Sequence, residues 1–348
     1  MRFAQVCSAH GFGHLTRQLE VSRHLRVRGV TPILFTAAPE SIVSEWLPDP
    51  DLVPWTADVG LVQSDSVTED LPGTRAALAQ RCSDTAVDAL AEVLLAHKID
   101  LVVADTPPTA LEAARRAGIP AVAVGNFTWP WIYAHYPELT DWSKRLAKWQ
   151  VAHDAAQLWP GPGMEGFRST TPFGLVGRRA HPDTTPTWPP GRALVSFGGF
   201  GLDELGARLP VVEGVTWVLA PPLSPLARPD CVFVEGVPYP AMVAASDLVL
   251  TKPGYGILAE TARAGTRLIW VPRGSFPEAG SITEELTKRG DRPVELPPGA
   301  SPARWRSALR SAVTLRLADP EPKPYPADES ARLADWLIQQ ARSKAPRR

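Results

Sequence analysis

The fold is decided by residues 2–35, which read RFAQVCSAHGFGHLTRQLEVSRHLRVRGVTPILF. The apolar run over residues 2–8 predicts a buried β-strand, and the glycines after it predict a turn. Leucines then recur at helical spacing across residues 15–25, and Gly29 marks the end of that helix. Residues 30–35 are expected to form a second strand. This strand–helix–strand order is typical of a parallel sheet covered by helices.

The same alternation continues along the chain. Strands are expected at residues 99–104, 121–124, 193–197, 215–219, 231–234, 248–250 and 267–271. Helices are expected at residues 109–117, about 139–158, 240–245, 257–264 and 328–342. The predicted fold class is α/β, with doubly wound parallel sheets.

The length of 348 residues favours two domains, because a domain typically has roughly 150 residues. Residues 181–192, HPDTTPTWPPGR, contain four prolines and are expected to form a semi-rigid linker. We expect a Rossmann-like domain at residues 1–180 and a second one at residues 193–326, facing each other across a cleft. Residues 327–348 are expected to form a helix and tail, with the helix packing either across the cleft or on its own domain.

Composition excludes several classes of protein. The formal net charge of -1 argues against a dedicated nucleic-acid binder. The three cysteines are far apart, which excludes a disulfide framework and paired zinc ligands. The Asp-x-Asp at residues 49–51 lies in a proline-broken loop and is a poor metal site. No apolar run reaches the roughly 20 residues that span a bilayer, and no secretory signal is evident, so a cytoplasmic location is expected.

The first candidate site is the turn after the first strand, which contains His10, Gly11, Gly13 and His14. Glycines let the backbone approach a ligand closely. Ligands of open α/β sheets bind at the carboxyl ends of the strands, where this turn is expected. A histidine at this place can accept a proton from an attacking hydroxyl at neutral pH. The alternative is that His14 only caps the turn.

Asp105 follows the strand that ends at residue 104 and is expected at the same sheet edge as His14. A carboxylate there could hold the imidazole in one tautomer and stabilise its protonated form. Capping of the following helix is an equally good interpretation.

The second half of the chain contains two turns that suit phosphate groups. The first follows a strand and includes Ser196, Gly198, Gly199 and Gly201. Backbone N–H groups of such a turn can hold a diphosphate. A tight turn without a ligand is the alternative.

The second turn follows the strand at 248–250 and consists of Lys252, Pro253, Gly254, Tyr255 and Gly256. Its lysine could neutralise phosphate charge while the glycines let the backbone approach. Glu260, expected in the first turn of the next helix, could accept the ribose hydroxyls or simply favour the helix dipole.

Further candidates follow neighbouring strands. Arg273 and Glu278 could bind the hydroxyls of a sugar, or pair with each other at the surface. Trp129, Trp131 and Tyr133 offer aromatic faces that suit a ring-shaped acceptor, although such residues are at least as often part of the core.

The chain resembles the GT-B glycosyltransferases, and most of all the N-terminal glycosyltransferase-like domain of plant L-arabinokinase and its stand-alone bacterial relatives. The likeness covers roughly residues 1–320. It is carried by the motifs HGFGHLTR at 10–17, VQSDSVT at 62–68, NFTW at 126–129, IYA at 132–134 and KPGYG at 252–256.

The resemblance implies two Rossmann-like domains and a nucleotide sugar held mainly by the second. It implies that His14 is the base and Asp105 its partner, that Glu260 binds the ribose and Glu278 the donor sugar, and that Asn126 lies on the acceptor side. It also implies that no metal cofactor is needed. Better-known glycosyltransferases carry His-Gly-Gly where this chain has Lys252-Pro-Gly, which leaves the donor open.

The expected activity is therefore metal-independent transfer of a sugar from a nucleotide-diphosphate donor, UDP-sugar being the first choice, to an acceptor hydroxyl. Inversion is favoured, since no second carboxylate nucleophile is evident. Two alternatives stay open: a sensor or scaffold that binds a nucleotide sugar without catalysis, and a nucleotide-sugar hydrolase in which water replaces the acceptor.

Overall fold

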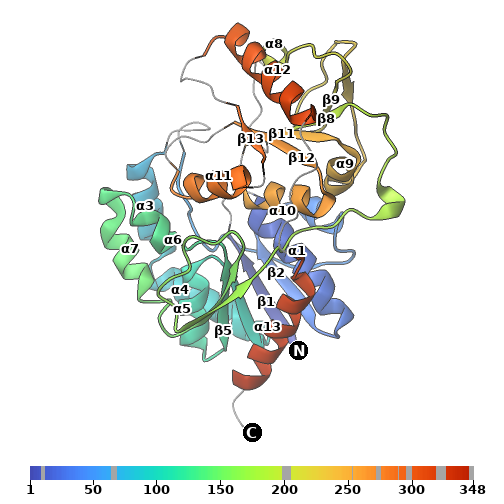
Figure 1. Cartoon of the computed structure of the whole chain (residues 1–348). Coiled ribbons are helices and arrows are strands. Elements are labelled where there is room, and N and C mark those ends of the chain that lie inside the picture. The colour runs from blue at the N-terminus through green and yellow to red at the C-terminus, as the bar shows by residue number, and fades with distance from the viewer. Residues whose placement is uncertain are drawn as a thin grey trace. The chain divides into compact units, whose positions relative to one another are not determined.

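The computed structural model describes residues 1–8, 12–63, 69–197, 205–252, 254–271, 276–288, 290–294, 300–318 and 327–344 (Figure 1). Its contacts divide the chain into two compact units, Met1–Gly177 with Pro326–Arg348, and Arg178–Tyr325. The expected turn residues His10, Gly11, Gly198, Gly199 and Gly201, together with Arg273, lie outside the described residues.

The first unit is built on a seven-stranded sheet with the order β3-β2-β1-β4-β5-β6-β7. Its strands are β1 (Arg2–Cys7), β2 (Thr31–Thr36), β3 (Asp51–Pro54), β4 (Leu101–Asp105), β5 (Ala121–Gly125), β6 (Asp154–Leu158) and β7 (Ser169–Phe173). Each pairing between neighbouring strands is parallel. The carboxyl ends of β1 and β4 therefore lie side by side, with Cys7 opposite Asp105.

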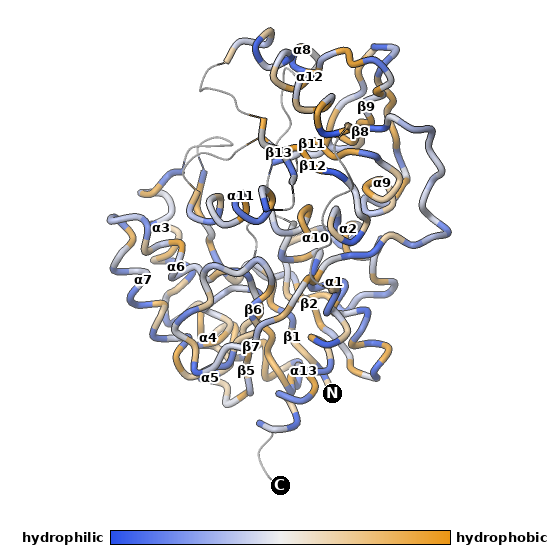
Figure 2. The backbone as a smooth tube through the Cα atoms, in the orientation of Figure 1, coloured by the Kyte–Doolittle hydropathy of each residue, from blue (hydrophilic) through white to orange (hydrophobic). Residues whose placement is uncertain are grey.

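Helices cover both faces of this sheet. They are α1 (Phe12–Val27), α2 (Glu40–Ser44), α3 (Leu71–Arg81), α4 (Asp84–Ala96), α5 (Pro108–Ala117), α6 (Trp129–Tyr133), α7 (Thr140–Ala147) and α13 (Ser330–Lys344), with a 3-10 turn η1 (Pro137–Leu139). Because successive strand residues point to opposite faces, Ala4 and Val6 pack with α4 and α5, whereas Phe3 packs with α1 and α13. Figure 2 shows the orange, hydrophobic strands inside this helical cover.

The last helix belongs to the first unit. Leu333 and Leu337 of α13 are fully buried in the same core cluster as Phe3. Arg28, just after α1, donates from Nε to Asp335 Oδ1 at 2.6 Å. The chain thus leaves this unit at Gly177 and returns to complete its core.

The second unit contains a six-stranded parallel sheet with the order β10-β9-β8-β11-β12-β13. Its strands are β8 (Arg192–Ser196), β9 (Thr216–Leu219), β10 (Cys231–Phe233), β11 (Leu248–Thr251), β12 (Arg267–Trp270) and β13 (Arg292–Pro293). Its helices are α8 (Leu205–Arg208), α9 (Tyr239–Ala245), α10 (Tyr255–Ala264), α11 (Ala279–Lys288) and α12 (Pro302–Ala318), with a 3-10 turn η2 (Pro182–Thr184). One face of the sheet packs on α12 and the other on α9 and Ile257 of α10.

Two helices are each followed directly by a glycine. Gly118 after α5 and Gly265 after α10 have φ angles of 68° and 69°, in the left-handed region. A residue with a Cβ atom would cost about 1 kcal/mol or more there. The prediction of an α/β fold with doubly wound parallel sheets is confirmed.

The helix expected over residues 139–158 is wrong in its second half. Helix α7 ends at Ala147, and residues 154–158 form strand β6 between β5 and β7. Alanine, glutamine and leucine in this segment all favour helix locally. Pairing with strands on both sides and burial of Ala155 and Ala156 outweigh that preference.

Candidate active site at the edge of the first sheet

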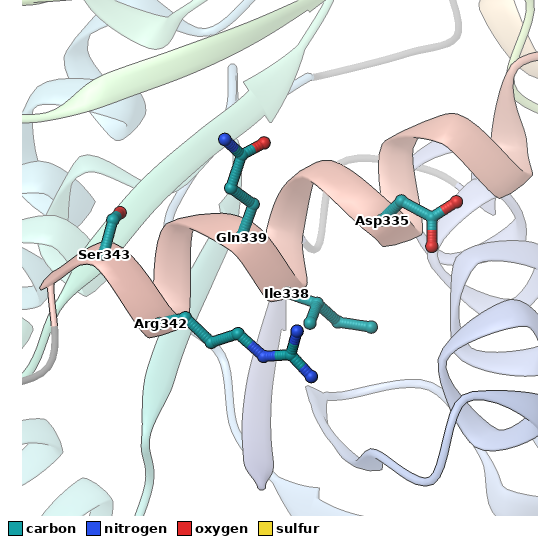
Figure 3. A pocket seen from close by; sticks show the side chains of 5 residues that line it. All are labelled: Asp335, Ile338, Gln339, Arg342 and Ser343. Carbon is teal, nitrogen blue, oxygen red and sulfur yellow. The ribbon is translucent and has the colours of Figure 1, made fainter.

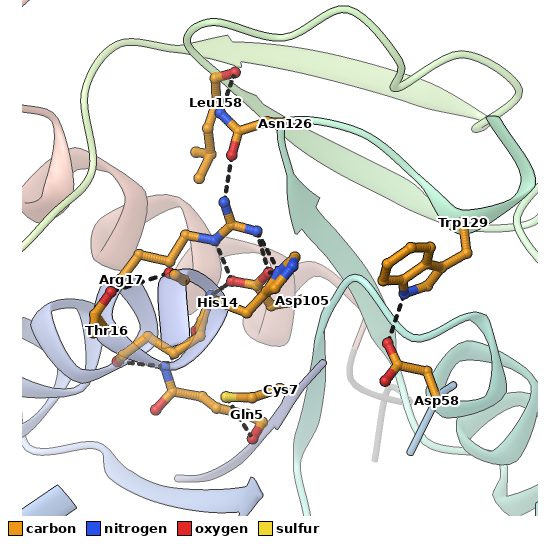
Figure 4. Close-up of polar contacts among 12 residues, drawn as sticks. Gln5, Cys7, His14, Thr16, Arg17, Asp58, Asp105, Asn126, Trp129 and Leu158 are labelled. Carbon is orange, nitrogen blue, oxygen red and sulfur yellow. Dashed lines mark hydrogen bonds and ion pairs between the residues drawn. The ribbon is translucent and has the colours of Figure 1, made fainter. Parts of the chain in front are cut away.

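His14 and Asp105 meet at the carboxyl edge of the first sheet. His14 lies in the first turn of α1, which follows β1, and Asp105 is the last residue of the adjacent strand β4. Their side chains are in contact, with His14 Nδ1 2.8 Å from Asp105 Oδ1 (Figure 4). Asp105 is fully buried and His14 is 6% exposed. The two residues that the sequence predicted as partners are therefore hydrogen-bonded.

Arg17 is the third member of this cluster. The sequence did not predict it as a site residue. It lies three residues after His14 on α1 and donates from Nε to Asp105 Oδ2 at 2.6 Å. Its NH2 group bonds Asp105 Oδ1, and its NH1 group bonds Asn126 Oδ1. The i,i+3 spacing from His14, within the same motif, is the signal that could have found it.

A second layer of amides supports the carboxylate. Gln18 donates from Nε2 to Asp105 Oδ2 at 2.7 Å. Gln5 of β1 in turn donates to Gln18 Oε1 at 2.7 Å, and Ser22 donates to Gln5. These buried side chains satisfy one another's hydrogen-bonding groups, which explains why α1 can turn polar residues toward the sheet.

Asp105 carries a negative charge despite its burial. Burial by itself raises the pKa of this carboxyl, since it penalises the charged form. The charge and hydrogen bonds of Arg17, with the hydrogen bond of His14, outweigh burial and lower the pKa to about 2. At neutral pH the cluster therefore contains an ionised carboxylate bonded to a histidine and an arginine.

Asn126 is a structural member of the cluster. It follows β5, is 2% exposed, and donates from Nδ2 to the carbonyls of Leu158 and Pro160 at 3.2 and 3.0 Å. Its carbonyl oxygen accepts from Arg17. Its polar atoms thus bind protein groups.

Besides His14, the described residues of the predicted turn include Gly13, which lies in the first turn of α1.

Of the three aromatic candidates, Trp129 and Tyr133 are part of the core. Trp129 is fully buried and donates from Nε1 to Asp58 Oδ2 at 2.6 Å. Tyr133 stacks on it and donates its hydroxyl to the carbonyl of Gly60 at 2.8 Å. Trp131 is only partly buried, so it is the one of the three that the core does not enclose.

The donor candidates of the second unit lie at the carboxyl ends of its strands. Ser196 ends β8 and its hydroxyl bonds that of Tyr239. Lys252 directly follows β11, Gly254 caps the amino end of α10, and Tyr255 and Gly256 form its first turn. Glu278 is buried just before α11.

Glu260 differs from its expected position. It lies in the second turn of α10 rather than the first, and it is 5% exposed. Arg178 donates from Nε to Glu260 Oε1 at 2.7 Å. Burial raises the pKa of the Glu260 carboxyl, and the charge of Arg178 opposes this rise only in part. The arginine was missed because it lies 82 residues away in the chain.

Neither a metal site nor a hollow along α13 adds to this cluster within the part of the chain that the structure describes. Among the described residues, no group of three or more histidine, cysteine or acidic side chains is arranged to hold a metal ion. A hollow of about 510 Å³ lies along α13 and is lined by Asp335, Ile338, Gln339, Arg342 and Ser343 (Figure 3). None of these is a candidate site residue.

Both sheets contain the strand order 3-2-1-4-5-6 of a Rossmann fold, and together they define the GT-B glycosyltransferase fold. The sequence is 32% identical to L-arabinokinase of Arabidopsis thaliana over an alignment of 306 residues, which covers 79% of this chain and 28% of the plant protein. The chain thus spans less than a third of that relative. No protein-family model matches the chain.

Solved structures agree on the fold. The glycosyltransferase of kitacinnamycin is 20% identical with a TM-score of 0.63, over 99% of this chain and 95% of that one. Phytolacca americana UGT2, complexed with UDP-2-fluoro-glucose and pterostilbene, is 14% identical with a TM-score of 0.61, over 98% and 94%. In the described part of the chain, no helix has the length and apolarity needed to cross a membrane.

Proposed function

We propose that this chain is a glycosyltransferase that moves a sugar from a nucleotide-diphosphate donor, UDP-sugar being the first choice, to an acceptor hydroxyl, with His14 as general base. The observation that carries the proposal is the His14–Asp105 hydrogen bond at the carboxyl edge of a parallel sheet. This edge is where open α/β sheets bind their ligands. Among the described residues, His14 Nε2 makes no hydrogen bond, which leaves it available for a substrate proton.

In the proposed reaction, the acceptor oxygen attacks the anomeric carbon of the donor sugar while His14 Nε2 takes the hydroxyl proton. The bond between the anomeric carbon and the diphosphate oxygen breaks, and the nucleoside diphosphate leaves with the electron pair. Asp105 stabilises the imidazolium that forms. A positioned base of this kind typically contributes about 10²–10⁴ to the rate.

The second unit supplies groups that suit the leaving diphosphate. Lys252 directly follows β11, and the ten-residue helix α10 begins three residues later, at Tyr255. Its first N–H groups and the lysine would take up phosphate charge without a metal ion. Support for a UDP-sugar comes from the UDP-2-fluoro-glucose held by the structurally similar UGT2.

Donor binding is tested first, by calorimetric titration with UDP, GDP and dTDP. We expect one nucleotide to bind, and Lys252→Ala to weaken its binding by about ten- to a hundredfold, because a charged hydrogen bond contributes roughly 1.5–3 kcal/mol. Lys288→Ala is the matched control, since Lys288 pairs with Glu284 and Glu285 on α11. Binding of none of the three nucleotides would overturn the donor site.

Transfer is tested next, with the sugar nucleotides of the base that binds and a panel of phenolic acceptors. We expect His14→Ala to lower the turnover rate by a factor of about 10²–10⁴ and to leave the nucleotide affinity unchanged. His181→Ala is the control, because His181 is exposed in the segment that contains η2. Full turnover in His14→Ala contradicts the proposed base. Sugar release without an acceptor would show a hydrolase, and binding without any product would show a sensor.

A further inference from the structure

The guanidinium of Arg17 is used on all three of its nitrogens. Nε and NH2 bond the two oxygens of Asp105, and NH1 bonds Asn126. Such a two-point contact holds the plane of a carboxylate, because rotation of either group breaks both bonds. Arg17 is 5% exposed, so solvent does not replace these bonds.

The other end of this arrangement is anchored to the sheet. Asn126 is fixed by backbone carbonyls at the end of β6 and just beyond it, and Gln18 holds Asp105 Oδ2 from the α1 side. Figure 4 shows the guanidinium between Asn126 and the His14–Asp105 pair. The carboxylate is therefore held from two directions before any ligand binds.

The position of the carboxylate decides which nitrogen of His14 carries the proton. Nδ1 of His14 lies 2.8 Å from Asp105 Oδ1, which can only accept, and 2.9 Å from Arg17 NH2, which can only donate. Arg17 NH2 also bonds Asp105 Oδ1, and because an ionised carboxylate is a stronger acceptor than a neutral imidazole nitrogen, NH2 donates to the carboxylate. An unprotonated Nδ1 would direct its lone pair at a carboxylate oxygen, which is repulsive at this distance. A proton on Nδ1 instead makes a charge-assisted hydrogen bond and leaves the lone pair on Nε2.

We propose that Arg17 is the positioning residue that keeps His14 in the tautomer that a general base needs, acting through Asp105. This inference rests on the proposed function, because it concerns the base of that reaction. Arg17 itself exchanges no proton. Without it, only Gln18 and His14 hold the Asp105 carboxylate, which can then turn relative to Nδ1, and the neutral imidazole can place its proton on either nitrogen.

The tautomer is measured by nitrogen NMR of the whole chain labelled at histidine, at pH 9 and without ligand. The signals of His14 are assigned by their loss in His14→Gln. We expect a protonated Nδ1 and an unprotonated Nε2 in the wild-type chain, and intermediate shifts for both nitrogens in Arg17→Gln. Arg17→Lys keeps the charge but not the two-point contact, so it should resemble Arg17→Gln and decides the matter if that variant does not fold.

Arg168→Gln is the matched control for loss of a two-point arginine contact. Arg168 bonds both oxygens of Asp154 at the amino end of β6, away from this cluster. We expect the His14 signals to be unchanged in this variant. Wild-type signals in both Arg17 variants would overturn the proposal.

Kinetics provide a second readout once a donor and acceptor are known. We expect Arg17→Gln to lower kcat by at least about tenfold, with KM for the donor nearly unchanged. In an Asp105→Asn background the same change should cost little more, because both residues act through one contact. Independent, multiplying losses would overturn the proposal. A wild-type chain that shows the expected tautomer but no sugar transfer would overturn the proposed function and leave the positioning role of Arg17 standing.

Discussion

Arg178 and Glu260 form a buried ion pair, with Arg178 Nε 2.7 Å from Glu260 Oε1. Arg178 is the first residue of the second unit, and Glu260 lies in α10 of the same unit. The carboxylate expected to bind the ribose is thus already bonded to a protein cation. Arg178 also lies over the ring of Tyr239, whose hydroxyl bonds Ser196. Two donor-site candidates of the sequence are therefore linked through Arg178 and Tyr239.

Removal of Arg178 should destabilise the second unit in a pH-dependent way. Arg178→Gln leaves a buried carboxylate unpaired, which costs about 3–5 kcal/mol. Burial raises the pKa of Glu260 in the folded state, so folding favours its protonated form. The stability that this protonation contributes is present at low pH and is lost as pH rises. The loss in melting temperature should thus be larger at pH 8 than at pH 5. Arg178→Gln with Glu260→Gln is the control and should show little pH dependence. An equal loss at both pH values would contradict the prediction.

Asp105 should stabilise the first unit with the opposite pH dependence. Its folded pKa of about 2 lies below the roughly 3.9 of an unfolded aspartate. The ionised form therefore contributes about 2–3 kcal/mol above pH 4, and this is lost as pH falls toward 2. Asp105→Asn also leaves Arg17 without its carboxylate. Chemical denaturation should therefore show a large loss in the free energy of unfolding at pH 7 and a smaller loss at pH 3. Asp141→Asn, which breaks an exposed pair with Arg75, is the control and should leave the free energy of unfolding nearly unchanged at either pH, because solvent screens that pair.

Trp129 and Trp131 should respond differently to substitution. Trp129→Phe removes the donor to the buried Asp58, which costs about 1–3 kcal/mol in the free energy of unfolding. Trp131→Ala removes a partly exposed ring and should cost less stability while weakening aromatic acceptors in the transfer assay. Urea denaturation and acceptor KM values separate the two effects. An unchanged acceptor KM in Trp131→Ala would remove it from the acceptor site.

Helix α13 should be required for the stability of the first unit. Leu337→Ala opens a cavity in the core shared with Phe3 and should cost about 2–5 kcal/mol. Gln339→Ala, on the exposed side of the same helix, is the matched control and should be nearly neutral. Hydrogen exchange should show faster exchange in β1 and β4 but not in β8 and β11. Faster exchange confined to the second unit would contradict the assignment of α13 to the first.

Much of the fold follows from local sequence alone. The strand at the start of the chain, the ends of the helices at residues 117 and 264, and the strand before Lys252 were all predicted close to their observed bounds. Each is set by side chains only a few residues apart, through alternation, helical spacing or the left-handed conformation that glycine tolerates. The hydrogen bond between His14 and Asp105 was also predictable, because parallel strands bring their carboxyl ends to one edge.

What the sequence determined by itself was the type and order of these elements, and the edge to which they bring chemically active residues. Tertiary structure alone decided that residues 154–158 form a strand and that α13 completes the first unit. It alone decided that Asn126 holds Arg17, and that Glu260 pairs with Arg178. The physical reason is that a buried polar group must find a partner wherever the fold brings one within reach, and that partner can lie anywhere along the chain.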